Sequence, residues 1–163
     1  MYISYTGSHG SGKTTAVYKT AFEMKLKYND KRVVTLAEIA SESPFKINKE
    51  TTEESQLWIF TSQIKRELEM INMYDIIVGD RTCVDCIGYS LVAGFYALAD
   101  AMIEVAKSHV HVYNEIIFKT IANNPYHFKD GIRSSDTKFR SDVENAILEA
   151  YKMIGIEDTL IME

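Results

Sequence analysis

Residues 7–14 read GSHGSGKT and fit the phosphate-binding pattern G-x-x-x-x-G-K-[ST]. The apolar run 1–5 precedes this loop directly and a helix-like segment, 14–28, follows it, which is the context that makes the motif specific. The three glycines can adopt backbone conformations closed to residues with a Cβ atom, so successive amide N–H groups can turn toward phosphate oxygens. The N-terminus of the following helix adds partial positive charge. A glycine-rich turn before an ordinary helix is the alternative, and these flanks disfavour it.

The pattern gives each loop position a chemical task. Lys13 is expected to reach the β- and γ-phosphate oxygens, and the Thr14 hydroxyl to bind a Mg²⁺ ion that bridges them. ATP and Mg²⁺ are therefore the expected cofactors. The residues expected to hold the nucleotide are Gly7, Ser8, His9, Gly10, Ser11, Gly12, Lys13, Thr14 and Thr15.

Two carboxylates and an arginine follow two predicted strands. Asp80 and Arg81 come directly after the apolar run 76–79, and Glu38 follows the run 33–37. In open parallel sheets ligands bind outside the carboxyl ends of the strands, so these three side chains should lie beside the phosphate loop.

The two carboxylates and the arginine are residue types suited to phosphoryl transfer. Asp80 could hold Mg²⁺, and Arg81 could bind a phosphate or an anionic group of the substrate. Glu38 could accept the proton of an attacking hydroxyl, with Glu42 as a weaker candidate for that role. The structural alternatives are a salt-bridged loop pair for Asp80 and Arg81, and a turn cap for Glu38.

Cations are concentrated in the segment 128–140, between a predicted strand and the last predicted helix. Guanidinium groups neutralise the charge that develops in phosphoryl transfer, and a flap that carries them can exclude water. We expect a lid near 127–140 that contributes Arg133 and Arg140 to catalysis, with Lys138 in support. The alternative is a solvated, charged helix start.

Three side chains on the predicted helices could recognise the second substrate. Trp58 and Tyr89 could stack on a planar base, and the amide of Gln63 suits hydrogen bonding to a base edge. Large aromatic residues at helical spacing are more often part of the core, which is the alternative for Trp58 and Tyr89.

The cysteine and histidine residues predict no metal site. Cys83 and Cys86 form a C-x-x-C without the second pair that a four-ligand zinc site needs, so we expect two ordinary thiols at a helix start. His109 and His111 have no acidic or cysteine ligands clustered with them in the sequence and are expected to be structural.

The elements that must position these residues alternate along the chain. Short β-rich runs near 2–6, 33–37, 75–79, 115–120 and 158–162 alternate with longer helical patterns, which predicts an α/β fold with a five-stranded parallel sheet and helices on both faces. A capping box at 51–54 predicts the start of the second helix. Gly88 and Gly94 interrupt the third helical region, which could be two helices, and the last helix should begin near Asp136 and end at Gly155.

Length and composition bound the assignment further. The 163 residues suit a single domain, 1–163, and the net charge of −5 does not favour a broad nucleic-acid interface. No apolar stretch approaches the ~20 residues that span a bilayer, and the start shows no signal-peptide pattern, so we expect a cytoplasmic protein without a membrane partner. The sequence is also compatible with a homodimer.

Together the loop, the strand ending in Glu38, the Asp80-Arg81-Thr82 step and the segment 130–133 resemble the P-loop kinases of nucleosides and nucleotides. More narrowly, the chain is similar to the AAA_28-type small ATPases related to nicotinamide riboside kinase, and more distantly to thymidylate and deoxynucleoside kinases. The resemblance implies a P-loop NTPase three-layer sandwich with ATP and Mg²⁺ at the first loop. It also implies that Glu38 is the catalytic base, that Arg81 is the arginine of the acid-arginine motif, and that a lid carries Arg133 and Arg140.

These observations favour an ATP- and Mg²⁺-dependent phosphotransferase that acts on a nucleoside, a nucleotide or a related hydroxyl or phosphate acceptor. A modified base or an end within a polynucleotide is a variant of that acceptor, which the acidic balance disfavours. The alternative from another class is a nucleotide-dependent regulatory or switch ATPase, for which the residues near Asp80 include no convincing water-positioning glutamine.

Overall fold

The computed structural model describes residues 1–121 and 137–163. Within them, five parallel strands form one sheet in the order β2-β3-β1-β4-β5. The strands are β1 Tyr2–Thr6, β2 Val33–Leu36, β3 Ile76–Asp80, β4 Glu115–Phe118 and β5 Leu160–Met162. The central strands β1 and β3 are buried along their whole length. The five-stranded parallel sheet predicted from the sequence is confirmed.

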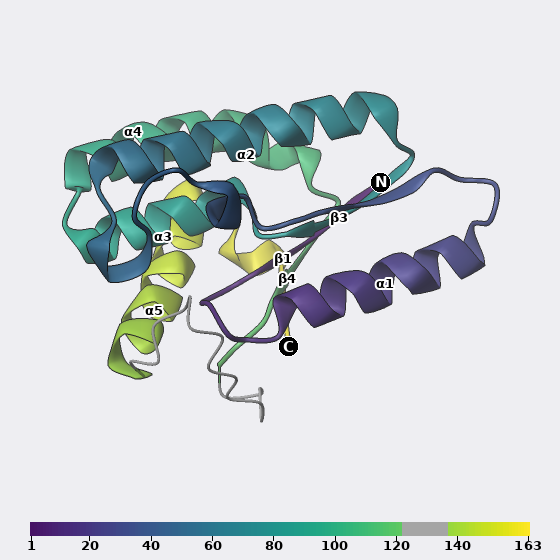
Figure 1. Cartoon of the computed structure of the whole chain (residues 1–163). Helices are drawn as coiled ribbons and strands as arrows, with labels where there is room; N and C mark the ends of the chain where they lie inside the picture. Colours follow the sequence, from purple (N-terminus) through teal and green to yellow (C-terminus); the bar gives the residue numbers. More distant parts are fainter. Residues whose placement is uncertain (122–136) are drawn as a thin grey trace.

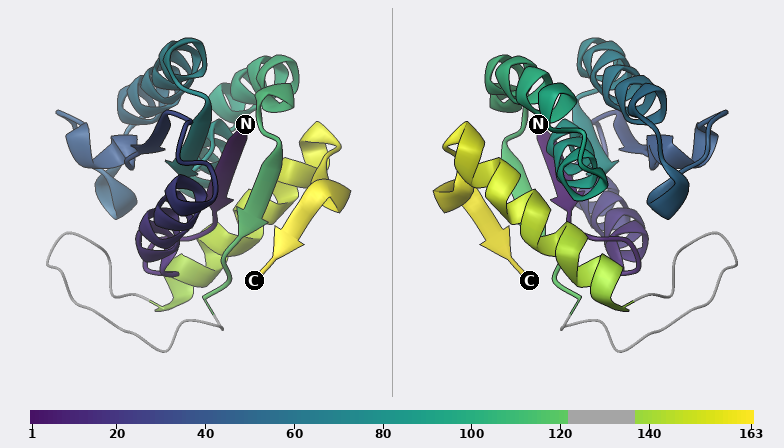
Figure 2. Two further views of the ribbon diagram at one scale, coloured as in Figure 1. Left: turned by 90° about the vertical axis from the view of Figure 1, so that its right-hand side faces the viewer. Right: turned by 90° about the vertical axis from the view of Figure 1, so that its left-hand side faces the viewer.

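Helices cover both faces of this sheet. They are α1 Lys13–Lys27, α2 Glu53–Met73, α3 Cys83–Ala93, α4 Tyr96–His109 and α5 Thr137–Ile154. Short 3₁₀ turns lie at Ile39–Glu42 (η1), Asn48–Glu50 (η2), Val110–Val112 (η3) and Glu157–Thr159 (η4). Figures 1 and 2 show α1 on one side of the sheet and α2 and α4 on the other.

Alternation along the strands explains the two layers. Successive strand residues point to opposite faces, so Tyr2 and Ile77 join the large core beneath α2, α3, α4 and α5, whereas Ile3 and Val78 pack against Val17 of α1. The larger core lies on the side of α3, and α3 in turn packs mainly against α5.

Helix boundaries follow the predicted capping chemistry with one shift. The N-cap of α2 is Thr52, whose side chain accepts a hydrogen bond from the amide of Ser55, so the predicted start at Thr51 is one residue early. The third helical region is indeed two helices, because Gly94 ends α3 in a left-handed conformation. Gly155 ends α5 in the same way, and Asp136 lies outside the described residues.

Gly88 allows α3 and α5 to approach closely. A Cβ atom at Gly88 would lie 2.4 Å from Cγ1 and 2.8 Å from the backbone nitrogen of Ile147. Because backbone atoms of Ile147 are among these contacts, repacking of the Ile147 side chain would not relieve the clash.

Gly88→Ala should therefore destabilise the protein, although alanine is the better helix former by about 1 kcal/mol. Overpacking of this kind costs about 1–3 kcal/mol, which outweighs the gain in propensity. Chemical denaturation should show a lower midpoint for this variant, whereas Ser108→Ala on the exposed face of α4 should leave the midpoint equal or higher. An unchanged midpoint for Gly88→Ala would contradict the close packing of the two helices.

None of the helices in the described residues is both long and apolar enough to cross a lipid bilayer.

Candidate active site

The phosphate loop connects the carboxyl end of β1 to the start of α1. Gly7, Gly10 and Gly12 have φ angles of 126°, 73° and 88°, which other residues rarely adopt. The Lys13 ammonium folds back over the loop and donates to the carbonyl of Ser8 at 2.7 Å and to Ser11 Oγ at 3.4 Å. The glycine conformations expected for a cradle of backbone amides are therefore present.

Lys13 is held in an environment that weakens its charge. The pKa of Lys13 is lowered from 10.5 to about 8, chiefly by burial and then by the charge of Arg81, while Asp80, Asp85 and Glu38 act in the opposite direction. A buried ammonium that makes few hydrogen bonds is suited to an incoming anion, because the anion would restore the lost stabilisation.

Oxygen ligands suited to Mg²⁺ meet beside Lys13. The Thr14 hydroxyl donates to Asp80 Oδ2 at 2.6 Å. Asp80 Oδ1 and Ser8 Oγ are buried and have no hydrogen-bond partner among the described residues. Mg²⁺ prefers hard oxygen ligands and takes one or two from the protein together with phosphate oxygens. The orphaned Asp80 oxygen and the Thr14 hydroxyl fit such an ion.

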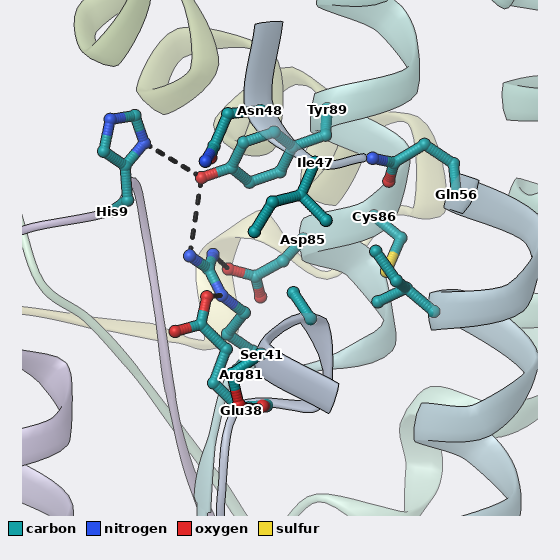
Figure 3. A pocket seen from close by; sticks show the side chains of 12 residues that line it. His9, Glu38, Ser41, Ile47, Asn48, Gln56, Arg81, Asp85, Cys86 and Tyr89 are labelled. Carbon is teal, nitrogen blue, oxygen red and sulfur yellow. Dashed lines mark hydrogen bonds and ion pairs between the residues drawn. The ribbon is translucent and has the colours of Figure 1, made fainter. Parts of the chain in front are cut away.

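Arg81 forms an ion pair with Glu38 across the ends of β3 and β2 (Figure 3). Its Nε donates to Glu38 Oε1 at 2.7 Å, with both side chains largely buried. Arg81 has a φ angle of 87°, and this conformation is fixed by a 2.8 Å bond from its amide to the carbonyl of Tyr5 and a 2.7 Å bond from Ser4 Oγ to its own carbonyl. The backbone thereby aims the guanidinium across the loop.

Several neighbours keep the guanidinium of Arg81 charged. Burial by itself lowers the pKa of Arg81, but Glu38, Tyr89, Asp85 and Asp80 together raise it well above its ordinary value. Arg81 therefore carries its positive charge at neutral pH.

Asp85 holds the loop, Arg81 and the start of α3 together. Its Oδ1 accepts from Arg81 Nη1 at 3.1 Å and from the Gly7 amide at 3.3 Å. Its Oδ2 accepts from Thr6 Oγ1 at 2.8 Å and from the amide and hydroxyl of Thr82 at 2.9 and 3.0 Å. Asp85 was not predicted as a site residue, although its capping-box spacing from Thr82 and its i,i+4 spacing from Arg81 are both visible in the sequence.

A cavity of about 110 Å³ borders the Glu38–Arg81 pair, and both of these side chains line it. Tyr89 lies in its wall, where its hydroxyl contacts His9 Nδ1 at 3.1 Å and Arg81 Nη2 at 3.4 Å (Figure 3). His9 thus turns its side chain from the phosphate loop into this cavity. The lining consists of His9, Glu38, Ala40, Ser41, Ile47, Asn48, Gln56, Ile59, Arg81, Asp85, Cys86 and Tyr89.

Of the predicted lid residues, the structure describes Arg140 and Lys138. Arg140 is buried at the start of α5 and donates to the carbonyls of His9 at 3.1 Å and Gly10 at 3.2 Å, so it lies against the phosphate loop. Lys138 is exposed. Arg133 lies outside the described residues, as does most of the predicted lid segment 127–140.

Two of the predicted substrate contacts lie away from the cavity. Trp58 is partly buried against the large core. Gln63 is buried within a polar cluster and donates to Glu67 Oε1 at 2.8 Å and to the carbonyl of Arg81 at 3.4 Å. Neither side chain lines the cavity, and Gln63 is placed to steady the backbone of Arg81.

The cluster around Glu67 was not foreseen from the sequence. This fully buried carboxylate accepts hydrogen bonds from Tyr2 at 3.0 Å and Tyr113 at 2.8 Å, and it contacts His109 Nε2 at 2.5 Å. His109 is therefore part of a buried network, in line with the structural role expected for it.

Both thiols are free and buried at the start of α3. Burial raises the pKa of Cys83 and of Cys86, so both are protonated, unreactive thiols. Among the described residues, no group of three or more metal-ligating side chains of the His, Cys, Asp or Glu type comes together.

Comparison with solved structures places this arrangement among known folds. A thymidylate kinase from Ehrlichia chaffeensis superposes with a TM-score of 0.70 at 18% identity. The match covers 100% of this chain and 91% of the thymidylate kinase chain. A NadR protein in complex with NR has a TM-score of 0.71 at 15% identity. The match covers 99% of this chain and 43% of the NadR chain. A deoxyadenosine kinase from M. mycoides with bound dATP has a TM-score of 0.65 at 16% identity, covering 100% and 90%.

No family model matches the sequence, and no curated protein matches it. The structural likeness shows that the chain has the α/β fold of the P-loop nucleoside and nucleotide kinases, as the sequence motifs predicted.

Proposed function

We propose that the protein is a phosphotransferase that moves the γ-phosphoryl group of ATP, with Mg²⁺, to a hydroxyl or phosphate of a nucleoside, a nucleotide or a related small molecule. The observation that carries the proposal is the placement of the phosphate loop and the Glu38–Arg81 pair at one edge of the sheet, beside a cavity that Glu38, Arg81 and His9 of the loop all line. Arg81 Nη1 even donates to the Gly7 carbonyl at 3.2 Å, so donor loop and acceptor cavity adjoin.

Each residue has a role in this proposal. The loop amides and Lys13 bind the phosphates, and Thr14 and Asp80 would hold the Mg²⁺, which supplies charge neutralisation when bound. Glu38 orients the acceptor and takes its proton, while Arg81 fixes Glu38 and faces the reacting groups. Arg140 braces the loop from α5 through its two carbonyl contacts.

Consumption of ATP by the purified protein tests the proposal. Turnover should depend strongly on the presence of a nucleoside, a nucleotide or a related acceptor, and the phosphorylated acceptor should be found by mass spectrometry. Turnover of ATP that no acceptor changes would contradict the proposal and favour a regulatory ATPase.

The pKa of Lys13 predicts how the reaction depends on pH. Lys13 is charged below its pKa of about 8 and neutral above it. Its attraction for phosphate is therefore lost as the pH rises, and kcat/KM for ATP, which reports the free enzyme, should fall between about pH 7.5 and 9.5.

A matched variant tests the assignment of that fall to Lys13. Lys13→Arg keeps its charge throughout because the pKa of arginine exceeds about 12. Its lower kcat/KM for ATP should not fall over the same pH interval. A fall of equal size in both proteins would assign the titration to another group.

A further inference from the structure

Arg81 already has two carboxylate partners on the acceptor side of the site. Glu38 Oε1 lies 2.7 Å from Nε, and Asp85 Oδ1 lies 3.1 Å from Nη1. Asp85 is 1% exposed and is fixed by further hydrogen bonds from Thr6, Gly7 and Thr82, so it cannot turn away from the arginine. Asp85 therefore remains beside Arg81 whatever occupies the cavity.

The charge of the cavity wall is consequently negative. Arg81 is the only lysine or arginine among the described lining residues, whereas Glu38 and Asp85 are both acidic. One cation and two carboxylates give these side chains a net charge of −1. The turn η1, which borders the cavity through Ala40 and Ser41, adds no cation.

The hydrogen bonds of Arg81 leave no free edge for a phosphate. Nε is bound to Glu38, and Nη1 is bound to Asp85 and to the Gly7 carbonyl. Bidentate recognition of a phosphate needs two parallel N–H groups on one edge. The most weakly used donor is Nη2, 3.4 Å from the Tyr89 hydroxyl. A single hydroxyl needs only one such donor, and it could give its proton to a carboxylate.

The remaining space also favours an uncharged group. The cavity measures about 110 Å³ and is lined by both carboxylates, so a phosphate in it would lie against them. The other polar groups of the lining include the side-chain amides of Asn48 and Gln56, which carry no charge.

We infer that Asp85 is a specificity-determining residue, which engages Arg81 so that the cavity takes an uncharged hydroxyl acceptor, such as a nucleoside, in preference to a phosphate monoester. The inference rests on the proposed function and narrows it to one acceptor class. Asp85 acts through Arg81 and the charge of the wall, without touching the reacting atoms.

Kinetics with paired acceptors test the inference. For nucleosides and the 5′-monophosphates of the same bases, kcat/KM should favour the nucleoside by about 100-fold or more, because like charges brought together at a binding site cost several kcal/mol. Asp85→Asn removes one negative charge from the wall and should shift this ratio toward the monophosphate by about tenfold. Asp100→Asn makes the same change on the exposed side of α4 and should leave the ratio unchanged.

A binding measurement on the unaltered protein covers the case in which Asp85→Asn fails to fold. Calorimetric titration without ATP should show tighter binding of the nucleoside than of its monophosphate. Preference of the unaltered protein for monophosphates would overturn the inference but would not count against the proposed kinase function. So would a folded Asp85→Asn variant with an unchanged ratio. Absence of transfer to either acceptor class would instead count against the proposed function.

Discussion

Replacement of Lys13 by methionine is expected to lower the rate of phosphoryl transfer by about 10²–10³-fold, the loss found when one preorganised donor to transition-state charge is removed. The Lys13 ammonium is buried inside the glycine-rich loop, where it donates to the carbonyl of Ser8. Single-turnover kinetics at saturating ATP would measure the loss in the chemical step.

The same substitution should not destabilise the fold. The pKa of Lys13 is lowered from 10.5 to about 8, so holding this charge in the folded state costs about 3 kcal/mol at 1.36 kcal/mol per pKa unit. Methionine has a similar length and no charge, and the thermal midpoint should equal or exceed that of the unaltered protein.

Lys19→Met is the matched control for this prediction. Lys19 lies on the same helix with 76% of its side chain exposed, and its substitution should leave transfer unchanged. Near-normal activity of Lys13→Met would show that the loop does not bind phosphate in the proposed way.

Glu38→Gln is expected to reduce kcat by about 10²–10⁴-fold, the usual contribution of a general base. The amide keeps the shape of the carboxylate and can still accept the hydrogen bond from Arg81 Nε, but it cannot take a proton. The KM for the acceptor should change much less than kcat, because the effect falls on the transition state.

Glu42→Gln separates Glu38 from the other carboxylate near the same strand end. Glu42 is half exposed and pairs with Arg66 at 3.4 Å, away from Arg81. Loss of kcat in Glu42→Gln with normal kcat in Glu38→Gln would transfer the role of base to Glu42. Normal kcat in both would leave Glu38 as a structural partner of Arg81.

The sequence alone determined the parts of the site that depend on local geometry and on sheet direction. The glycine spacing of the phosphate loop is a local property, and the observed φ angles of Gly7, Gly10 and Gly12 agree with it. Parallel strands end at one edge of the sheet, so Glu38 and Arg81, 43 residues apart, were expected near one another and form an ion pair. The alternation of β-rich runs with helical patterns also predicted the five strands, and the glycines of the third helical region predicted the break at Gly94.

Tertiary packing alone decided which side chains face the cavity. Asp85 reads in the sequence as a helix cap, and its bonds to Thr6 and Gly7 span 79 and 78 residues. Trp58 and Gln63 lie on a helix whose rotation about its axis is set by packing. As a result, Trp58 packs against the hydrophobic core and Gln63 donates to the buried Glu67.

Arg140 shows the same limit on another helix. It was expected in a lid because it closes a run of cations, and the structure places it against carbonyls of the loop 130 residues earlier in the chain. Charge and spacing specify what a side chain can bind, whereas contacts over such separations depend on how helices pack on the sheet. Only the folded chain fixes that arrangement, because it results from the burial of many side chains at once and from no single motif.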